Sequence, residues 1–295
     1  AENVETINVV YVTDGARVLE GVVSIRDLIL ANDNKKISEI MNDNVIFAET
    51  NTDQEEIARM FSEYDFLAMP IVDKEKRLVG IVTVDDVIDV IEEEASEDIS
   101  VMAGVTPNEK PYLKTSAWRI WLNRFPWLML LMISATFTGL IISKNEALLN
   151  NGIFGILLTS CIPMIMDTGG NAGGQASATI VRGIALGDVE FKDIFKVMLK
   201  EFLVSILVGL SLAIVCFGKI LLVDGVIFGT VGVTAASAAI IASAMFFTIV
   251  IAKFVGCSLP LIAKKLKLDP AVMASPFITT IVDILSLLVY CFLAT

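Results

Sequence analysis

The sequence predicts a protein of two parts, an α/β domain followed by an α-helical membrane domain with five spans. Three observations support this fold class. Charge divides the 295-residue chain, because residues 1–100 carry a net charge of −16 and residues 101–295 carry +4. The mean hydropathy of +0.72 is too high for an ordinary soluble protein. A stretch of the acidic part also recurs 59 residues later, which indicates a domain built from two similar modules.

Five apolar stretches are long enough to cross a bilayer, which takes about 20 helical residues. We expect these spans near residues 127–143, 152–186, 202–222, 226–252 and 271–293. Basic residues gather before the first span, between the second and third, and between the fourth and fifth, where we count Lys253. Because Lys and Arg mark the cytoplasmic side, the pattern predicts a multi-pass protein of the plasma (inner) membrane. Its N-terminus and acidic domain lie in the cytoplasm and its C-terminus lies outside.

The internal repeat pairs residues 18–29, VLEGVVSIRDLI, with residues 77–88, RLVGIVTVDDVI. Its shared positions are Gly21 with Gly80, Ser24 with Thr83, and Asp27 with Asp86. Each copy reads as a short strand followed by the start of a helix. Ser or Thr followed by an acid three residues later is also a helix-capping pattern, and capping alone would explain either copy.

Composition excludes several classes of function. The chain has no histidine, which argues against the usual zinc, copper and iron sites and against histidine-based catalysis. A strongly acidic domain repels nucleic acid, so we expect no nucleic-acid partner. We interpret the four cysteines as small apolar residues. No nucleophile–base pair is evident, and we predict that the protein is not an enzyme.

Acidic side chains gather in three places in the first hundred residues. They lie around residues 53–65, around 85–89 and around 92–98. A solvated acidic surface is the ordinary explanation of such runs. The alternative is that divalent cations bridge the carboxylates, because Mg²⁺ prefers oxygen ligands and keeps several of its waters.

Asp283 is the strongest candidate for a pore residue. It lies well inside the last span, where a charged side chain costs at least ~2.5–3.5 kcal/mol and usually faces a cavity or a pathway. Ser275, Thr279, Asp283, Ser286 and Tyr290 are spaced so that they form one polar stripe along a helix. The structural alternative is a carboxylate paired with a neighbouring helix, but no basic residue is expected at this depth. We therefore favour an ion pathway.

A proline and four glycines interrupt the second span, in PMIMDTGGNAGGQ at residues 163–175. We expect a break in the helix here, because irregular backbone at membrane depth is tolerated where it lines a water-filled cavity. Asn171 and Gln175 would then contact the outer waters of a hydrated cation. A phosphate-binding loop is rejected, because no strand precedes the glycines and no Lys follows them.

These motifs resemble two known families. The repeat is similar to the cystathionine-β-synthase-type (CBS) module, a βαββα unit that forms tandem pairs. PMIMDTGGNAGGQ at 163–175, LDPA at 268–271 and PFITTIVD at 276–283 resemble the MgtE family of magnesium channels. The resemblance implies four parts, which are the second half of a first CBS module (1–36), a second CBS module (37–91), an acidic connecting or plug helix (92–124) and a pore domain (125–295). The first module lacks its opening half, so we expect the complete protein to begin before residue 1.

The resemblance also assigns residues to sites. The pore metal would be held by Asp283, Thr279 and Asn171, with one Asp283 from each chain of a homodimer. Regulatory Mg²⁺ would bind at Asp53, Glu55, Asp65, Asp86, Glu94, Glu97, Asp98 and Asp269. Regulation by ATP or another adenine nucleotide would involve Ser24, Arg26, Asp27, Phe66 and Thr83.

The function implied is Mg²⁺ uptake through a membrane channel or transporter. Cytosolic Mg²⁺ would bind the acidic domain and the connecting helix, and this binding would close the pore. Two alternatives remain, which are transport of Co²⁺, Ni²⁺ or Mn²⁺ and a membrane receptor that senses metal or nucleotide without transport. Besides a second copy of itself and membrane lipid, the sequence indicates no partner.

Overall fold

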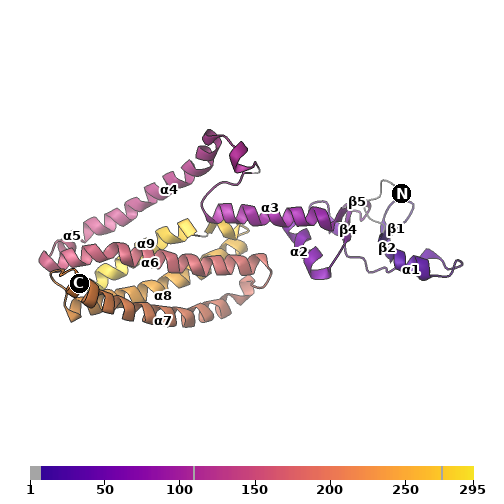
Figure 1. Cartoon of the computed structure of the whole chain (residues 1–295). Helices are drawn as coiled ribbons and strands as arrows, with labels where there is room; N and C mark the ends of the chain where they lie inside the picture. The colour runs from indigo at the N-terminus through magenta and orange to yellow at the C-terminus, as the bar shows by residue number, and fades with distance from the viewer. Residues whose placement is uncertain (1–7, 109, 274) are drawn as a thin grey trace. The chain divides into compact units, whose positions relative to one another are not determined.

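The computed structural model describes residues 8–108, 110–273 and 275–295, without the side chain of Ser275. The chain divides into two compact units, residues 1–96 and 97–295, and each is described by itself. Figure 1 traces both units along the chain. The first unit mixes strands and helices, and the second is helical, as predicted from the sequence.

The first unit contains two small sheets. Its elements are β1 (Val9–Thr13), β2 (Leu19–Ser24), α1 (Ile25–Leu30), the 3-10 turn η1 (Ile37–Glu39), β3 (Ala48–Glu49), α2 (Gln54–Tyr64), β4 (Ala68–Val72), β5 (Leu78–Thr83) and α3 (Val84–Met102). The residues of α3 from 97 onward belong to the second unit. β1 and β2 form an antiparallel hairpin, and the second sheet has the order β3-β4-β5. The two repeat copies occupy β2–α1 and β5–α3, so each is a strand that leads directly into a helix.

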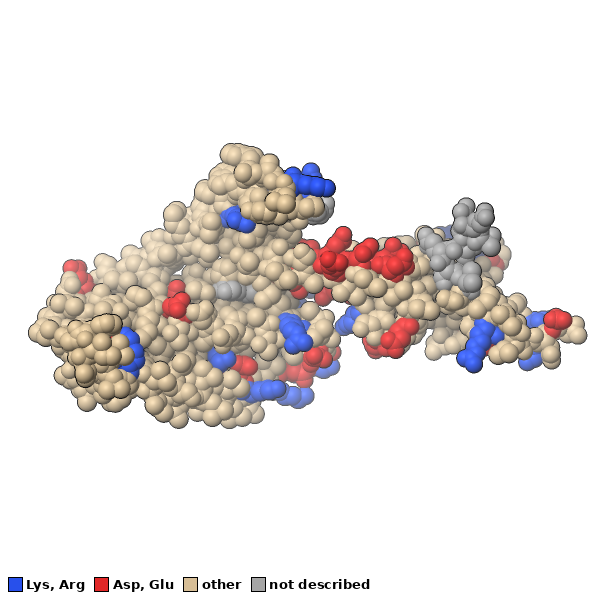
Figure 2. All heavy atoms as spheres, in the orientation of Figure 1, with Lys and Arg blue, Asp and Glu red and all other residues tan. Residues whose placement is uncertain are grey.

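Hydrogen bonds join the two halves of this unit. The amide of Leu19 donates to the carbonyl of Lys76 at 2.9 Å, and that of Leu78 donates to Arg17 at 2.8 Å. Phe61, Met69 and Val87 are buried together from α2, β4 and α3 and form the core. Acidic side chains lie along α3 and α2 in Figure 2, on the outside of this core.

The second unit consists of long apolar helices. Its elements are the 3-10 turn η2 (Tyr112–Lys114), α4 (Ala117–Lys144), α5 (Glu146–Leu149), α6 (Gly152–Ala185), η3 (Phe191–Asp193), α7 (Ile194–Lys219), the π-helical η4 (Ile220–Ile227), α8 (Ala235–Lys265), η5 (Pro270–Met273) and α9 (Ser275–Ala294). Five of the described helices are long and apolar enough to cross a membrane, which confirms the number of spans predicted. The segment 92–124 does not form one connecting helix. It comprises the end of α3, a loop with η2, and the start of α4.

The predicted break in the second span is wrong. α6 continues as one helix from Gly152 to Ala185, through Pro163 and all four glycines. The glycines allow close packing instead. A side chain at Gly173 would meet Ile278 at 2.8 Å and the carbonyl of Ala252 at 3.1 Å, and one at Gly169 would meet Thr248 at 2.6 Å. Small residues let α6 approach α8 and α9 closely, as is usual between helices in lipid.

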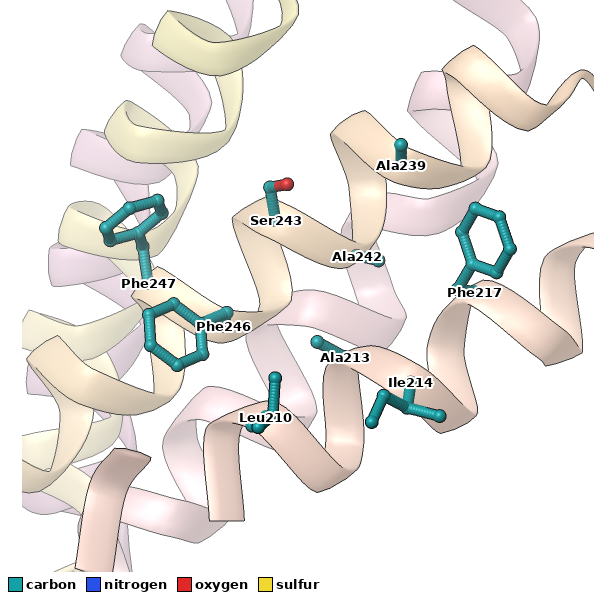
Figure 3. A pocket seen from close by; sticks show the side chains of 9 residues that line it. All are labelled: Leu210, Ala213, Ile214, Phe217, Ala239, Ala242, Ser243, Phe246 and Phe247. Carbon is teal, nitrogen blue, oxygen red and sulfur yellow. The ribbon is translucent and has the colours of Figure 1, made fainter. Parts of the chain in front are cut away.

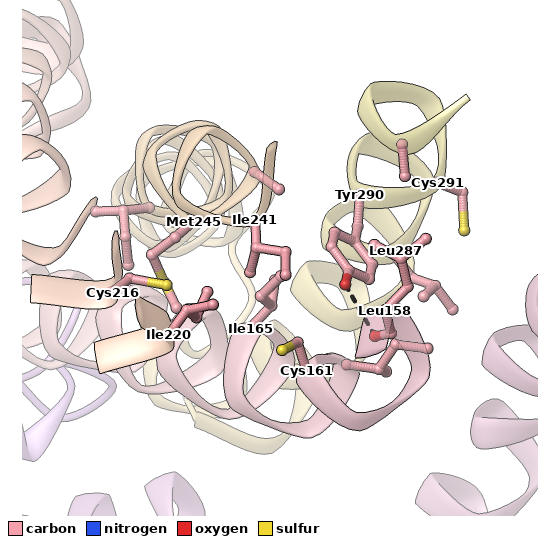
Figure 4. Close-up of a cluster of buried hydrophobic side chains, with 14 of the residues drawn as sticks. Leu158, Cys161, Ile165, Cys216, Ile220, Ile241, Met245, Leu287, Tyr290 and Cys291 are labelled. Carbon is pink, nitrogen blue, oxygen red and sulfur yellow. Dashed lines mark hydrogen bonds between the residues drawn. The ribbon is translucent and has the colours of Figure 1, made fainter. Parts of the chain in front are cut away.

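The core of the helical unit lies between α6, α7, α8 and α9. Figure 4 shows its apolar side chains, among them Leu158, Ile241 and Leu287. The hydroxyl of Tyr290 donates a 2.8 Å hydrogen bond to the carbonyl of Leu158, which ties α9 to α6. All four cysteines are free and buried, which agrees with our interpretation of them as small apolar residues.

An apolar cavity of about 440 Å³ lies between α7 and α8. Figure 3 shows its lining, in which small side chains such as Ala213 and Ala242 leave space between Phe217 and Phe246. The two helices are closely packed at Gly209, where a side chain would meet the Phe246 ring at 3.1 Å. The predicted fourth span began nine residues too early, since α8 starts only at Ala235.

Candidate functional site

Asp283 lies near the middle of α9, eight residues after its first residue and eleven before its last. At a rise of 1.5 Å per residue, this is about 12 Å from one end and about 16 Å from the other. α9 therefore carries a carboxylate deep in an apolar helix.

The Asp283 side chain lines a cavity of about 520 Å³ between α4, α6 and α9. Thr279, one turn earlier on α9, lines the same cavity. The remaining lining residues are Leu131, Ala135, Thr138, Gly139, Ile142, Met166, Pro276 and Thr280. The cavity thus has mostly apolar walls, to which three threonines and one aspartate add polar side chains.

One carboxylate oxygen of Asp283 has no hydrogen-bond donor. Oδ1 is buried and accepts no hydrogen bond from the residues that the structure describes. None of the ion pairs between described residues includes Asp283 either. A buried, unpaired carboxylate is unfavourable unless a cation or a donor compensates it. The arrangement therefore fits a cation that enters the cavity.

Asn171, the third predicted pore residue, does not line this cavity. It is exposed on α6, and Asp167, one turn earlier, is exposed on the same face. Asp167 is close enough to Asp283 for the two carboxylates to repel each other. Our sequence analysis missed Asp167, although it lies in the motif at 163–175. The missed signal was its charge, which is as costly as that of Asp283 once α6 is a continuous membrane helix.

The polar stripe on α9 divides between two environments. Thr279 and Asp283 face the cavity, whereas Ser286 is fully buried against α6 and Tyr290 is held by Leu158. Ser275 belongs to the same predicted stripe, but its side chain lies outside the described part of the structure. The spacing of these residues predicts one polar face of α9. In the structure α6 packs over the part of this face that carries Ser286 and Tyr290.

Two lysines in or at the end of the apolar helices are paired with carboxylates. Lys253, assigned from the sequence to a connection, lies inside α8, is only 6% exposed and pairs with Glu201 of α7 at 3.4 Å. Lys219 at the end of α7 pairs with Asp224 at 2.7 Å. Each lysine thus has its own carboxylate. Neither lysine pairs with Asp283 or lines its cavity.

The predicted regulatory carboxylates lie in several separate places. Asp53 caps the N-terminus of α2 by accepting from the amide of Glu55, and Asp65 caps its C-terminus in a left-handed conformation. Glu94 accepts a 2.6 Å hydrogen bond from Gln54, and Asp86 accepts one of 2.9 Å from Thr83.

The other regulatory candidates belong to the helical unit. Glu97 and Asp98 lie on the last turns of α3, and Asp269 accepts a 2.7 Å hydrogen bond from the amide of Ala271. No three acidic, histidine or cysteine side chains among the described residues are close enough together to hold one metal ion. Within a single chain, the described carboxylates therefore form no compact metal centre.

A third cavity, of about 380 Å³, lies within the first unit. Phe66 and Asp65 line it, together with Tyr11 and Ala68. Burial raises the pKa of Tyr11 to about 12, so its phenol stays protonated even at an alkaline pH at which an exposed tyrosine ionises.

Two of the predicted nucleotide contacts do not line this cavity, but each is paired across a sheet with a residue that does. Ser24 pairs with Val9 in the β1–β2 hairpin, and Thr83 pairs with Ala68 across β4 and β5. Ser24 also bonds Asp27 at 2.6 Å, in the capping arrangement foreseen from the sequence. Of the five predicted contacts, only Phe66 lines the cavity itself. Arg26 is exposed on the first turn of α1.

Comparison with known proteins identifies both units. Residues 162–293 match the MgtE family, described as divalent cation transporters, and residues 37–93 match the CBS domain. The magnesium transporter MgtE of Thermus thermophilus is 38% identical over 292 residues, and that of Bacillus subtilis is 40% identical over 299 residues. These alignments cover 98% and 100% of this chain, but only 62% of each relative.

One similar solved structure is the cytosolic domain of the Mg²⁺ channel MgtE in complex with ATP. It is 54% identical and covers 30% of this chain and 36% of that one, with a TM-score of 0.30. The matching family is one of transporters, in agreement with our prediction that the chain is not an enzyme. The chain therefore joins a CBS domain to a membrane domain of the MgtE family.

Proposed function

We propose that this protein conducts Mg²⁺ across the membrane and that Asp283 binds the passing ion. The observation that carries the proposal is the buried, unpaired carboxylate oxygen of Asp283 beside a cavity between three membrane helices. A conducted ion must bind favourably but weakly, and Asp283 carboxylates that hold a still-hydrated Mg²⁺ meet both conditions. The relatives that match nearly the whole chain are magnesium transporters, which supports the choice of ion.

The pathway is completed by a second copy of the chain. Asp167, Asn171 and Gln175 are exposed at intervals of four residues on α6, a helix that is otherwise long and apolar enough to span a membrane. Polar side chains do not face lipid without cost, so this face meets either water or protein. Two copies related by a twofold axis would enclose it and bring two Asp283 carboxylates to one ion.

Regulation rests on the acidic first unit, which lies in the cytoplasm. The net charge of −16 in the first hundred residues repels itself unless cations neutralise it. When Mg²⁺ is plentiful, ions bridge the carboxylates of the first unit to Glu97 and Asp98 at the end of α3 and to Asp269, and the pore is closed. When Mg²⁺ falls, the carboxylates repel and the pore opens. The third cavity, beside Phe66, Tyr11 and the strands of Ser24 and Thr83, is the place where an adenine nucleotide such as ATP would adjust this response.

Flux into liposomes that contain a Mg²⁺-sensitive dye tests the proposal. With the full chain reconstituted, we expect Mg²⁺ entry that Asp283→Asn lowers by about tenfold or more, the effect of removing about 1.4 kcal/mol of ion binding. Asp188→Asn, which neutralises an exposed carboxylate between α6 and η3, is the matched control and should conduct normally.

Further arms of the same assay separate the alternatives. Competition by Co²⁺, Ni²⁺ and Mn²⁺ measures selectivity, and Mg²⁺ or ATP on the side of the acidic unit measures regulation. Normal Mg²⁺ entry through the Asp283→Asn protein would exclude the site. The absence of flux of any divalent ion from the unmodified protein would favour a sensor without transport.

A further inference from the structure

The segment from residue 110 to residue 125 carries a concentration of positive charge that the ion pathway does not use. We call it the basic aromatic segment. Its four basic residues, all exposed, are Lys110, Lys114, Arg119 and Arg124. No acidic residue occurs between positions 110 and 124. None of the ion pairs recorded between described residues includes any of these four side chains.

The first part of this segment is a turn held by side-chain hydrogen bonds. The side-chain amide of Asn108 donates to Thr115 Oγ1 at 2.8 Å and to the carbonyl of Lys110 at 3.1 Å. Thr115 Oγ1 is in turn 3.1 Å from the carbonyl of Pro111. The turn presents Tyr112 and Leu113 outward, and Leu113 is 95% exposed. Tyr112 is 68% exposed, so an apolar neighbour at this turn would remove two adjacent apolar side chains from water.

The second part is an aromatic row at the start of α4. Trp118 stacks on Trp121 with ring centroids 4.7 Å apart, and Trp121 stacks on Phe125 at 4.8 Å. All three rings are exposed. Trp at the end of a span is typical of the boundary between lipid headgroups and acyl chains, because the ring is apolar and its N–H is polar.

The length of α4 places this row at the same boundary. The helix has 28 residues and is about 42 Å long, whereas the hydrocarbon core of a bilayer is about 30 Å thick. About eight residues therefore extend beyond the hydrocarbon core. The basic and aromatic side chains at the start of α4 indicate that these are the first residues of the helix. The loop before α4 holds this end, since Gly104 packs against Trp127 and the amide of Thr106 donates to the carbonyl of Asn123 at 3.0 Å.

We propose that the basic aromatic segment binds the headgroups of anionic phospholipids. The Lys and Arg side chains contact phosphates, Leu113 and Tyr112 enter the boundary with the acyl chains, and the stacked rings set the depth. Carboxylates of a protein would satisfy the positive charge equally well. They would leave the exposed leucine and the indole rings in water, which is why the observations favour lipid.

Tryptophan fluorescence tests this directly, because the three tryptophans of the chain all lie at positions 118–127. The full chain is reconstituted in phosphatidylcholine vesicles that contain a small fraction of either brominated phosphatidylglycerol or brominated phosphatidylcholine. We expect the anionic lipid to quench more strongly at equal fraction. The variant Arg119→Gln with Arg124→Gln should lower this preference by about fivefold for each residue. Inorganic phosphate in the buffer should not compete.

The matched control removes two charges that are already paired. Lys192 pairs with Glu190 at 2.9 Å and Lys196 pairs with Asp193 at 3.0 Å, so Lys192→Gln with Lys196→Gln should keep the preference. Equal quenching by the two brominated lipids would overturn the proposal. The proposal would also be overturned if both double variants changed the quenching to the same extent. A preference for the anionic lipid that millimolar phosphate abolishes would overturn it as well. Weak quenching by both lipids would instead place the segment against protein and also overturn it.

Discussion

The pair between Lys253 and Glu201 is the most buried pair of opposite charges recorded in the structure. Both side chains lie largely out of contact with solvent, between α7 and α8, at 3.4 Å. Such a pair adds little stability over apolar residues, but removing one partner leaves an uncompensated charge in a low-dielectric environment. In a membrane helix the remaining charge is more costly still.

We therefore predict that Lys253→Met destabilises the helical unit by about 3–5 kcal/mol. The thermal midpoint of the protein in detergent measures this loss. Lys253→Met combined with Glu201→Gln should recover most of it, because neither charge then remains. Lys219→Met, at a pair whose lysine is 41% exposed, should cost less than the buried site. A double variant as unstable as the single one would contradict the explanation by charge.

Single residues were predictable from the sequence where their chemistry conflicts with their surroundings. Asp283 stood out because a carboxylate in an apolar span is costly wherever the helix packs. Lys253 was misassigned because a lysine near the end of an apolar stretch reads as a connection when the end of the helix is unknown. Its partner Glu201 lies 52 residues away, and no local pattern joins the two.

At the scale of elements, α6 shows why glycine motifs are ambiguous. Pro and four Gly in 13 residues are typical of a broken helix in water, where each Gly costs about 1 kcal/mol relative to Ala. In the structure the helix is continuous, because neighbouring helices use the missing side chains to approach its backbone. The closest approach is between α6 and α8, where a side chain at Gly256 would collide with the carbonyl of Gly173.

Gly256→Ala is therefore expected to destabilise the protein by about 1–3 kcal/mol, since the added methyl group forces backbone apart. Gly218→Ala is the matched control, because a side chain at Gly218 in α7 has no atom within 4 Å. It should leave stability unchanged or raise it through helix propensity. The thermal midpoint in detergent again provides the measurement, and equal effects of the two substitutions would contradict the packing argument.

The π-helical stretch after α7 is an element that sequence reasoning did not predict. Residues 220–227 belong to η4, and Asp224 lies within it. The side chain of Asp224 pairs with Lys219, and its carbonyl accepts a 2.8 Å hydrogen bond from the amide of Thr230. Apolar periodicity does not distinguish an α-helix from a π-helix over so few residues, so this stretch read as the end of one span and the start of the next.

At the scale of the whole molecule, the exposed polar face of α6 predicts contact between two copies of the chain. We expect Asn171→Cys to form a disulfide-linked dimer when the protein is oxidised in a membrane, because the twofold axis would bring the two α6 helices together. The native cysteines are buried and should add little background. Leu207→Cys, exposed on α7, is the control. Cross-linking is read as a dimer band on a non-reducing gel, and cross-linking at Leu207→Cys but not at Asn171→Cys would place the interface elsewhere.

The sequence by itself determined the fold class, the five spans and the acidic first unit, and it singled out Asp283 as a candidate. These features depend on composition, on the length of apolar runs and on the cost of a charge in lipid, and each can be evaluated within one stretch of chain. Only the tertiary structure decided that α6 is unbroken, that Lys253 is neutralised by Glu201, and that Thr279 and Asp283 face a cavity while Ser286 and Tyr290 face protein. The reason is that each of these outcomes depends on which helices are neighbours, and residues far apart in the sequence supply the contacts.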